Sequence, residues 1–214
     1  MAVQFNWTTK SRFKIYSLVW EDKANIQINA LAVLYKNSGT FNDDYLKKET
    51  EKLTEEINKR VISTIPEEEL KELLQSISDY YGLSLESQNI LSNYMIVAAF
   101  SFYEKSFKKI LELTGKFTEE ELASCYKKKE AVKLLKQKFN IEYKKLTDYA
   151  KIEELRCLNN DIKHNGMVGR ELASANSKWV VGTPITNTSA DFSRLMDGPK
   201  NLLRDLSNKI EPQL

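Results

Sequence analysis

The sequence predicts an all-α protein, and three observations support this. Glycine (7 residues) and proline (4 residues) are scarce in a chain of 214 residues, which leaves little of the turn chemistry that β-sandwiches and barrels need. Lysine, leucine, glutamate and isoleucine, which suit helices, are abundant. Apolar residues also recur at three- and four-residue spacing along much of the chain. We therefore expect a helical bundle.

The first third of the chain predicts three helices separated by turn signals. Residues 11–36 have apolar residues at helical spacing, and Gly39 follows them as a C-cap. A second helix is expected over residues 42–62. A third helix begins at Pro66, a residue type that suits the first helical turn, and ends near Gly82.

We place a boundary after residue 84, between an N-terminal helical layer (1–84), which can also belong to the same domain, and a main helical domain (85–214). The strongest helix of the chain, residues 87–113, opens the main domain, and Gly115 follows it as a stop signal. Its wide apolar stripe indicates a core helix. The stripe consists of Ile96, Phe100, Tyr103, Phe107, Ile110 and Leu111.

Shorter elements are expected after Gly115. Thr118 and Glu121 form a capping-box pattern at the start of a short helix. Residues 177–186 have strand character, because Trp179 and two valines precede Gly182, so a short β-hairpin or an extended arm is expected there. The later helices are expected over residues 127–139, near 143, over 148–164 and over 190–210, the last with a break at Gly198-Pro199.

Composition and charge favour a soluble, cytoplasmic protein. The N-terminus lacks an apolar signal core, and the longest apolar run, residues 95–102, is far shorter than the roughly 20 residues of a membrane span. Cys125 and Cys157 are far apart and predict no disulfide, as is usual in a reducing compartment. The net charge of +2 does not by itself imply nucleic-acid binding. However, nine lysines against three acidic residues between positions 126 and 151 form either a solvated helical face or a binding surface.

The segment that most favours chemistry is LRCLNNDIKHNG, residues 155–166. In a helix, one of its faces carries Arg156, Asn160 and His164 at i, i+4 and i+8, with Asn159 and Lys163 beside them. Asparagine is less favourable than alanine inside a helix by about half a kcal/mol, so the adjacent pair suggests a role other than helix formation. The opposite, apolar face consists of Ile152, Leu155, Leu158 and Ile162.

His164 is the only histidine of the chain. It would occupy the last helical turn, where the free carbonyl groups favour its protonated form. An imidazole beside amides and lysines suits a phosphodiester, either as a binding group or as a general acid or base. A lone histidine before Asn165-Gly166 is also typical of an ordinary helix C-terminus, and chemistry alone favours that interpretation.

Two segments resemble the signature helices of the HEPN superfamily, helical domains found in many prokaryotic RNase toxins and defence proteins. The first is Ser92–Lys105, with Glu104 at an acidic position after an aromatic residue. The second is Glu153–Gly166, which resembles a helix that ends in Arg-Asn-x-x-x-His. The resemblance covers about residues 85–210 and implies a HEPN-like bundle, to which the N-terminal helices are an addition.

The resemblance implies a metal-independent endoribonuclease of a toxin or antiviral defence type. It would act on RNA as a homodimer, without a cofactor, under the control of an antitoxin or another regulatory protein. His164 would transfer a proton, Asn160 would orient the phosphate, and Lys163 or Arg156 would stabilise its negative charge. Glu104 would hold these side chains in place. The residues expected to bind the RNA are Asn159, Lys127, Lys128 and Lys133.

One departure from the family pattern favours an alternative. Asn159 stands where the family has arginine, and the nearest arginine, Arg156, precedes His164 by eight residues, or about 12 Å along a helix. Its side chain would also lean toward the helix N-terminus, away from His164. The alternative is a catalytically degenerate HEPN-like module for dimerisation, RNA binding or regulation. A metalloenzyme is disfavoured, because the sequence shows no ligand cluster with zinc spacing.

Overall fold

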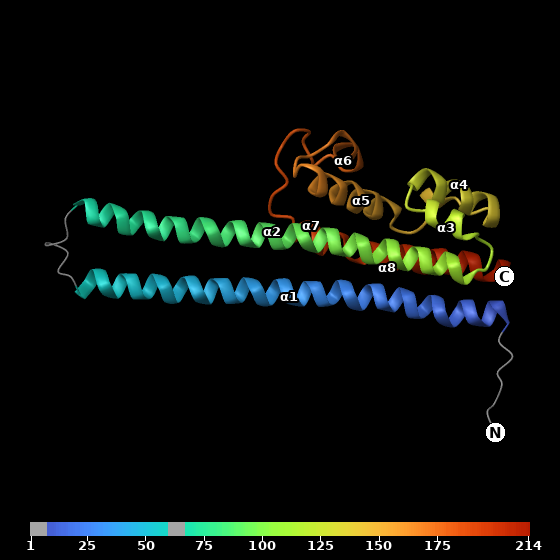
Figure 1. Ribbon diagram of the computed structural model, residues 1–214, viewed down its shortest axis with the longest axis horizontal. Coiled ribbons are helices and arrows are strands. Elements are labelled where there is room, and N and C mark those ends of the chain that lie inside the picture. Colours follow the sequence, from blue (N-terminus) through green and yellow to red (C-terminus); the bar gives the residue numbers. More distant parts are fainter. Residues whose placement is uncertain (1–7, 60–66) are drawn as a thin grey trace, which may run out of the picture.

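A long helical hairpin dominates the computed structural model, which describes residues 8–59 and 67–214 (Figure 1). Helix α1 spans Thr9–Lys59 and helix α2 spans Glu67–Leu113, and the two lie side by side in opposite directions. The shorter helices of the C-terminal half cover one half of the hairpin, and its other half extends beyond them. The predicted all-α helical bundle is confirmed.

The hairpin takes the place of several predicted shorter helices, so two predicted helix ends are wrong. Helix α1 continues through Gly39, and α2 continues through Gly82. A glycine inside a helix costs only about 1 kcal/mol relative to alanine, which the packing of α1 against α2 can offset. The boundary placed after residue 84 falls inside α2. The predicted helix start at Pro66 lies outside the residues that the structure describes.

Short helices follow the hairpin. The capping box predicted for the first of them is confirmed, since the N–H of Glu121 donates to Thr118 Oγ1 at 3.2 Å and the N–H of Thr118 donates to Glu121 Oε2 at 2.9 Å. Helix α6 was not predicted. The elements are α3 (Glu119–Ser124), α4 (Lys128–Phe139), the 3₁₀ turn η2 (Tyr143–Lys145), α5 (Tyr149–His164), α6 (Arg170–Ala175), α7 (Ser189–Leu195), α8 (Asp197–Ile210) and the 3₁₀ turn η3 (Glu211–Gln213).

Helix α5 lies at the centre of the C-terminal half and packs against α2, α6, α7 and α8. Ile152, Leu155 and Leu158 on its predicted apolar face are buried, and Ile162 packs against the same core. An ideal Cβ on Gly198 would lie 3.0 Å from the Cβ of Lys151, so a glycine lets the start of α8 approach α5 closely. The break before α8 falls at Met196, two residues earlier than expected.

Residues 177–186 form the extended arm and not the β-hairpin, the other form considered for them. Within residues 67–214 no β-strand forms, and the arm instead bonds to the turn that follows α5. The N–H of Val168 donates to the carbonyl of Thr183 at 2.9 Å, and the N–H of Ile185 donates to that of Gly166 at 2.7 Å. The arm therefore fixes the backbone just after the last residue of α5.

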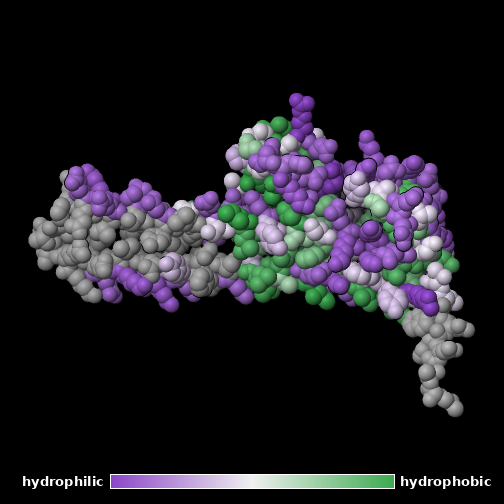
Figure 2. All heavy atoms as spheres, viewed as in Figure 1, coloured by the Kyte–Doolittle hydropathy of each residue, from purple (hydrophilic) through white to green (hydrophobic). Residues whose placement is uncertain are grey.

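Apolar side chains remain exposed on the hairpin. Figure 2 shows apolar residues gathered over its middle, where the covering helices end. A contiguous exposed patch of this kind commonly marks a protein interface. None of the helices over the described ranges is both long enough and apolar enough to span a bilayer. The exposed apolar residues include Ile15, Leu18, Val19, Ile26, Val33 and Leu34 of α1, and Leu85, Ile90 and Tyr94 of α2.

Candidate functional site

The outer face of α5 presents three of the residues predicted for chemistry. Arg156 and Asn160 are partly exposed on it, and His164 is exposed as the last residue of the helix. Lys163 precedes His164 in the same turn and is also exposed. The only imidazole of the chain is therefore open to a ligand and has a cation beside it.

A hydrogen-bonded turn holds the end of α5 in position. Gly166 has a φ of 67°, a conformation that favours glycine, and its N–H donates to the carbonyl of Asp161 at 2.9 Å. The carboxylate of Asp161 accepts the N–H of Gly169 at 2.6 Å. An ideal Cβ on Gly169 would lie 2.8 Å from Asp161 Oδ1, so this bond requires glycine or a shift of the aspartate. The turn and the arm together fix the backbone around His164.

Glu104 of α2 lies near the C-terminal part of α5. Although Glu104 is exposed on one side, burial raises the pKa of its carboxyl group, and attraction to the ammonium group of Lys163 partly offsets this. The two helices that the family resemblance pairs are thus neighbours in the fold. Glu104 and Lys163 are close enough for their charges to attract, and Glu104 also lines a cavity together with Arg156.

Two carboxylates hold Arg156 away from His164. Its Nη2 lies 2.7 Å from Glu153 Oε1 and 2.8 Å from Glu171 Oε2. The contact with Glu153 points toward the N-terminus of α5, as expected for a helical arginine. Although burial opposes the charge, these hydrogen bonds hold the pKa of Arg156 above its ordinary value. Arg156 is therefore engaged about two helical turns from the histidine.

Asn159, at the position of the family's arginine, points into the protein. It is only 3% exposed, and its Nδ2 donates to Asn160 Oδ1 at 3.2 Å. Within the described part of the chain its own Oδ1 has no hydrogen-bond partner. Asn159 is therefore placed to orient Asn160 and is far less accessible to RNA than a surface residue.

A basic groove of about 750 Å³ lies beside the N-terminal half of α5. Lys127 and Lys128, two of the lysines expected to bind RNA, line it together with Arg156 and with Arg170 of α6, which was not predicted. Lys128 is paired with Glu153 at 2.7 Å, whereas Lys127 is exposed. The third expected lysine, Lys133, is not among the residues lining the groove and lies 3.7 Å from Glu130.

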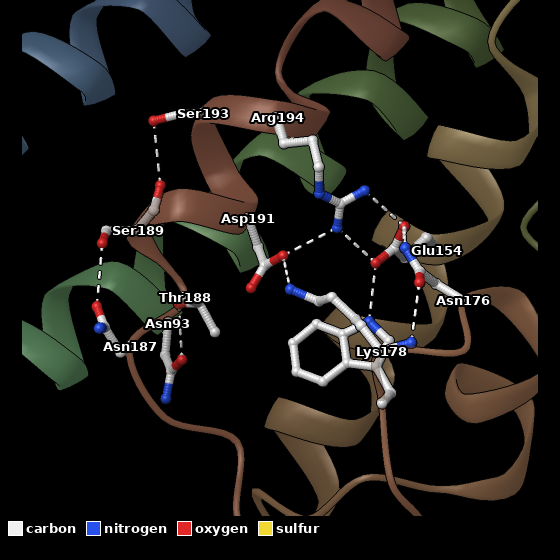
Figure 3. Close-up of polar contacts among 11 residues, drawn as sticks. Asn93, Glu154, Asn176, Lys178, Asn187, Thr188, Ser189, Asp191, Ser193 and Arg194 are labelled. Carbon is white, nitrogen blue, oxygen red and sulfur yellow. Dashed lines mark hydrogen bonds and ion pairs between the residues drawn. The ribbon is translucent and has the colours of Figure 1, made fainter.

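A buried carboxylate on the inner side of α5, that of Glu154, binds the arm and α7 (Figure 3). Glu154 is 3% exposed and accepts hydrogen bonds from both terminal nitrogens of Arg194, at 2.6 and 2.9 Å. It also accepts bonds from Asn176 at 3.0 Å and from the indole of Trp179 at 2.8 Å. Although burial opposes the charge, these bonds hold the pKa of Glu154 below its ordinary value.

Neighbouring pairs extend this network. Asp191 of α7 accepts a bond from Arg194 at 2.9 Å and is paired with Lys178 of the arm. The hydroxyl of Thr188, the N-cap residue of α7, donates to Asn93 Oδ1 of α2 at 2.9 Å, which ties the start of α7 to the hairpin. Every carboxylate oxygen of Glu154 is thus engaged, and we interpret the network as structural. One sign of this network is visible in the sequence: Glu154 is an acidic residue directly beside the apolar face of a helix.

The two cysteines are poorly suited to nucleophilic chemistry. Both are buried. Burial raises the pKa of the Cys125 thiol above its ordinary value and that of Cys157 to about 11. Little thiolate therefore forms at neutral pH, and the thiolate is the reactive species.

The structure separates the predicted site residues into two places. Asn160, Lys163 and His164 lie on the C-terminal part of α5, with Glu104 of α2 near Lys163, whereas Arg156 lines the basic groove with Lys127 and Lys128. Comparisons of the chain with protein-family models, with curated proteins and with solved structures gave no match.

Proposed function

We propose that this chain is a HEPN-like, RNA-directed protein, and that it is a metal-independent endoribonuclease. The observation that carries the proposal is the exposed imidazole of His164, next to Lys163 and on the same helical face as Asn160. Phosphodiester cleavage needs a group that exchanges protons and groups that stabilise negative charge on the phosphate. An imidazole, an ammonium group and an amide meet these needs without a metal ion.

In the proposed reaction, the 2′-hydroxyl of a ribose attacks the adjacent phosphorus. The O2′–P bond forms and the P–O5′ bond breaks, while the 2′-oxygen loses a proton and the leaving 5′-oxygen gains one. His164 transfers one of these protons, Asn160 orients the phosphate, and Lys163 stabilises its developing charge. Lys163 is favoured over Arg156 of the same chain, because Glu153 and Glu171 already hold that arginine.

A homodimer would supply the second histidine that one chain lacks. The reaction has two proton transfers, and each chain has one histidine, so two copies with their His164 residues in a shared cleft provide both an acid and a base. The exposed apolar residues of the hairpin, Ile26, Leu34 and Ile90 among them, support self-association. We further propose a cytoplasmic role as a toxin or an antiviral defence protein, controlled by an antitoxin or another regulatory protein.

Cleavage of RNA by the purified chain tests this function. We expect products with 2′,3′-cyclic phosphate ends, the same rate with and without EDTA, and a rate at least about 100-fold lower for His164→Ala, since general acid–base catalysis contributes about 10²–10⁴-fold. Asn208→Ala, at an exposed position of α8, is the control and should cleave like the parent. A His164→Ala variant that cleaves as fast as the parent would end the proposal.

The second candidate is a HEPN-like module that binds RNA or a partner but has lost catalysis. Two observations favour this candidate. The position of the family's arginine holds Asn159, which is uncharged and buried. Arg156 is charged, but Glu153 and Glu171 already bind it away from His164. This candidate predicts RNA that is shifted on a native gel and remains intact for hours. Clean cleavage products that disappear in His164→Ala would rule it out.

A further inference from the structure

An apolar cavity of about 330 Å³ lies between α2, α3, α4 and α5. Four aromatic residues, Phe100, Tyr103, Phe107 and Tyr143, line it, and each is less than 10% exposed. Organic ligand sites have volumes of roughly 300–1,000 Å³, so this cavity is at the lower end of that range. Its size and its ring-lined walls suit one flat ring system.

The cavity also has a polar group among its aromatic walls. The hydroxyl groups of Tyr103 and Tyr143 lie 2.6 Å apart. Two hydroxyls have two hydrogens, and the bond between them uses one, so the second O–H can donate to a ligand. A ligand that combines a flat apolar ring with hydrogen-bond acceptors on its edge would satisfy both features.

The cavity and the basic groove share a wall made of Lys128, Glu153 and Arg156. Lys128 and Arg156 both bind Glu153, at 2.7 Å each, so this wall is an ion-paired partition. On the groove side, Lys127, Lys129 and Arg170 add positive charge. The groove has five cationic residues and only three acidic ones, since Glu130 and Glu171 are its other carboxylates besides Glu153.

We infer that an unstacked base of single-stranded RNA binds in this cavity, while its phosphates lie along Lys127, Lys129 and Arg170. The inference rests on the proposed function in taking RNA as the ligand. Aromatic walls beside a groove of separate cations are typical of single-strand binding sites. A fatty acid would fill the cavity, but its single carboxylate would leave most of the groove's charge without a partner.

The position of the cavity relative to His164 gives the bound base a role. Its wall on α5 is formed by Ile152, Glu153 and Arg156, about two to three helical turns before His164. Glu104, which also lines the cavity, lies near Lys163 and so connects the two places. We therefore expect the base in the cavity to lie a few nucleotides from the scissile linkage. By selecting that base, the cavity would set where the strand is cut.

Fluorescence anisotropy with a labelled strand of roughly ten nucleotides tests the inference, with an abasic strand of equal length and charge as the comparison. Binding is measured with His164→Ala as the reference protein and with each variant added to it, so that cleavage does not interfere. Ala123 is exposed and lines the cavity, so Ala123→Phe should block it without changing the core. Ala190→Phe, at an exposed position of α7 outside the cavity, is the matched control.

We expect Ala123→Phe to weaken binding of the base-containing strand by about tenfold or more, and to leave the abasic strand and the control unchanged. Tyr143→Phe, which removes one hydroxyl and keeps the ring, should act in the same direction. The double variant Lys129→Ala/Arg170→Ala should weaken both strands and reduce the salt dependence.

Equal binding of the two strands by the reference protein, or no effect of Ala123→Phe and Tyr143→Phe, would overturn the inference and leave RNA as the substrate. If neither strand binds, the proposed function fails as well. Binding of a fatty acid that Ala123→Phe abolishes, without any effect on RNA, would assign the cavity to a different ligand and also overturn the inference.

Discussion

Replacing Glu154 with glutamine should destabilise the C-terminal half of the protein. The carboxylate accepts four hydrogen bonds, two of them from Arg194, and it is only 3% exposed. Removing one partner of a buried ion pair costs about 3–5 kcal/mol. The side chain of Arg194 is 40% exposed and can be hydrated once released, so we expect a loss of about 2–3 kcal/mol.

Urea unfolding measures this loss. Helix content followed by circular dichroism and tryptophan fluorescence should report the same lower midpoint, because the indole of Trp179 bonds Glu154 directly. Glu112→Gln, which removes an exposed pair with Lys109, should change the free energy of unfolding by less than about 0.5 kcal/mol. A Glu154→Gln variant within about 0.5 kcal/mol of the parent would refute the claim that this carboxylate holds the arm and α7.

Three further predictions concern stability. The pKa of Glu154 is lower in the folded than in the unfolded chain, so its carboxylate stabilises the fold fully above the unfolded pKa of about 4.3. This stabilisation is lost as the pH falls through the folded pKa. Urea midpoints measured from pH 6 to 3 should therefore fall less steeply in Glu154→Gln than in the parent. Gly169→Ala should lower the free energy of unfolding by about 1 kcal/mol or more, because its Cβ would displace the carboxylate of Asp161, and intact stability would disprove this. Gly82→Ala should raise the thermal midpoint by an amount equivalent to about 0.5–1 kcal/mol, since α2 is helical there and an added Cβ meets no atom within 4 Å; a lower midpoint would contradict it.

Local signals predicted most helices of the C-terminal half but not α6. The capping box at Thr118, the basic helix α4 and the termination of α5 at Asn165-Gly166 all depend on residues within one turn of each other. The period of the apolar residues also identified the buried face of α5, including Leu155 and Leu158. Interactions at such short range are fixed by the sequence around them and need no knowledge of the fold.

The features that the sequence did not reveal depend on long-range packing. Gly39 and Gly82 are stop signals for an isolated helix. In the hairpin, α1 and α2 pack along each other, and each helix continues through its glycine. The bonds of Glu154 reach residues 22 to 40 positions away, so no local pattern predicts them. The place of Arg170 in the basic groove with Lys127 could not be predicted for the same reason, because it depends on the packing of α6 against α5.

The contrast between the two sides of α5 bears on what its polar residues do. Glu154 on the inner side has a partner for each oxygen, and its loss should change stability. On the outer side, His164 and Lys163 are exposed at a backbone that the Asp161–Gly169 bond and the arm hold in place. An accessible imidazole on a supported backbone suits the proton transfer that we propose, because such a group must be positioned before the substrate arrives.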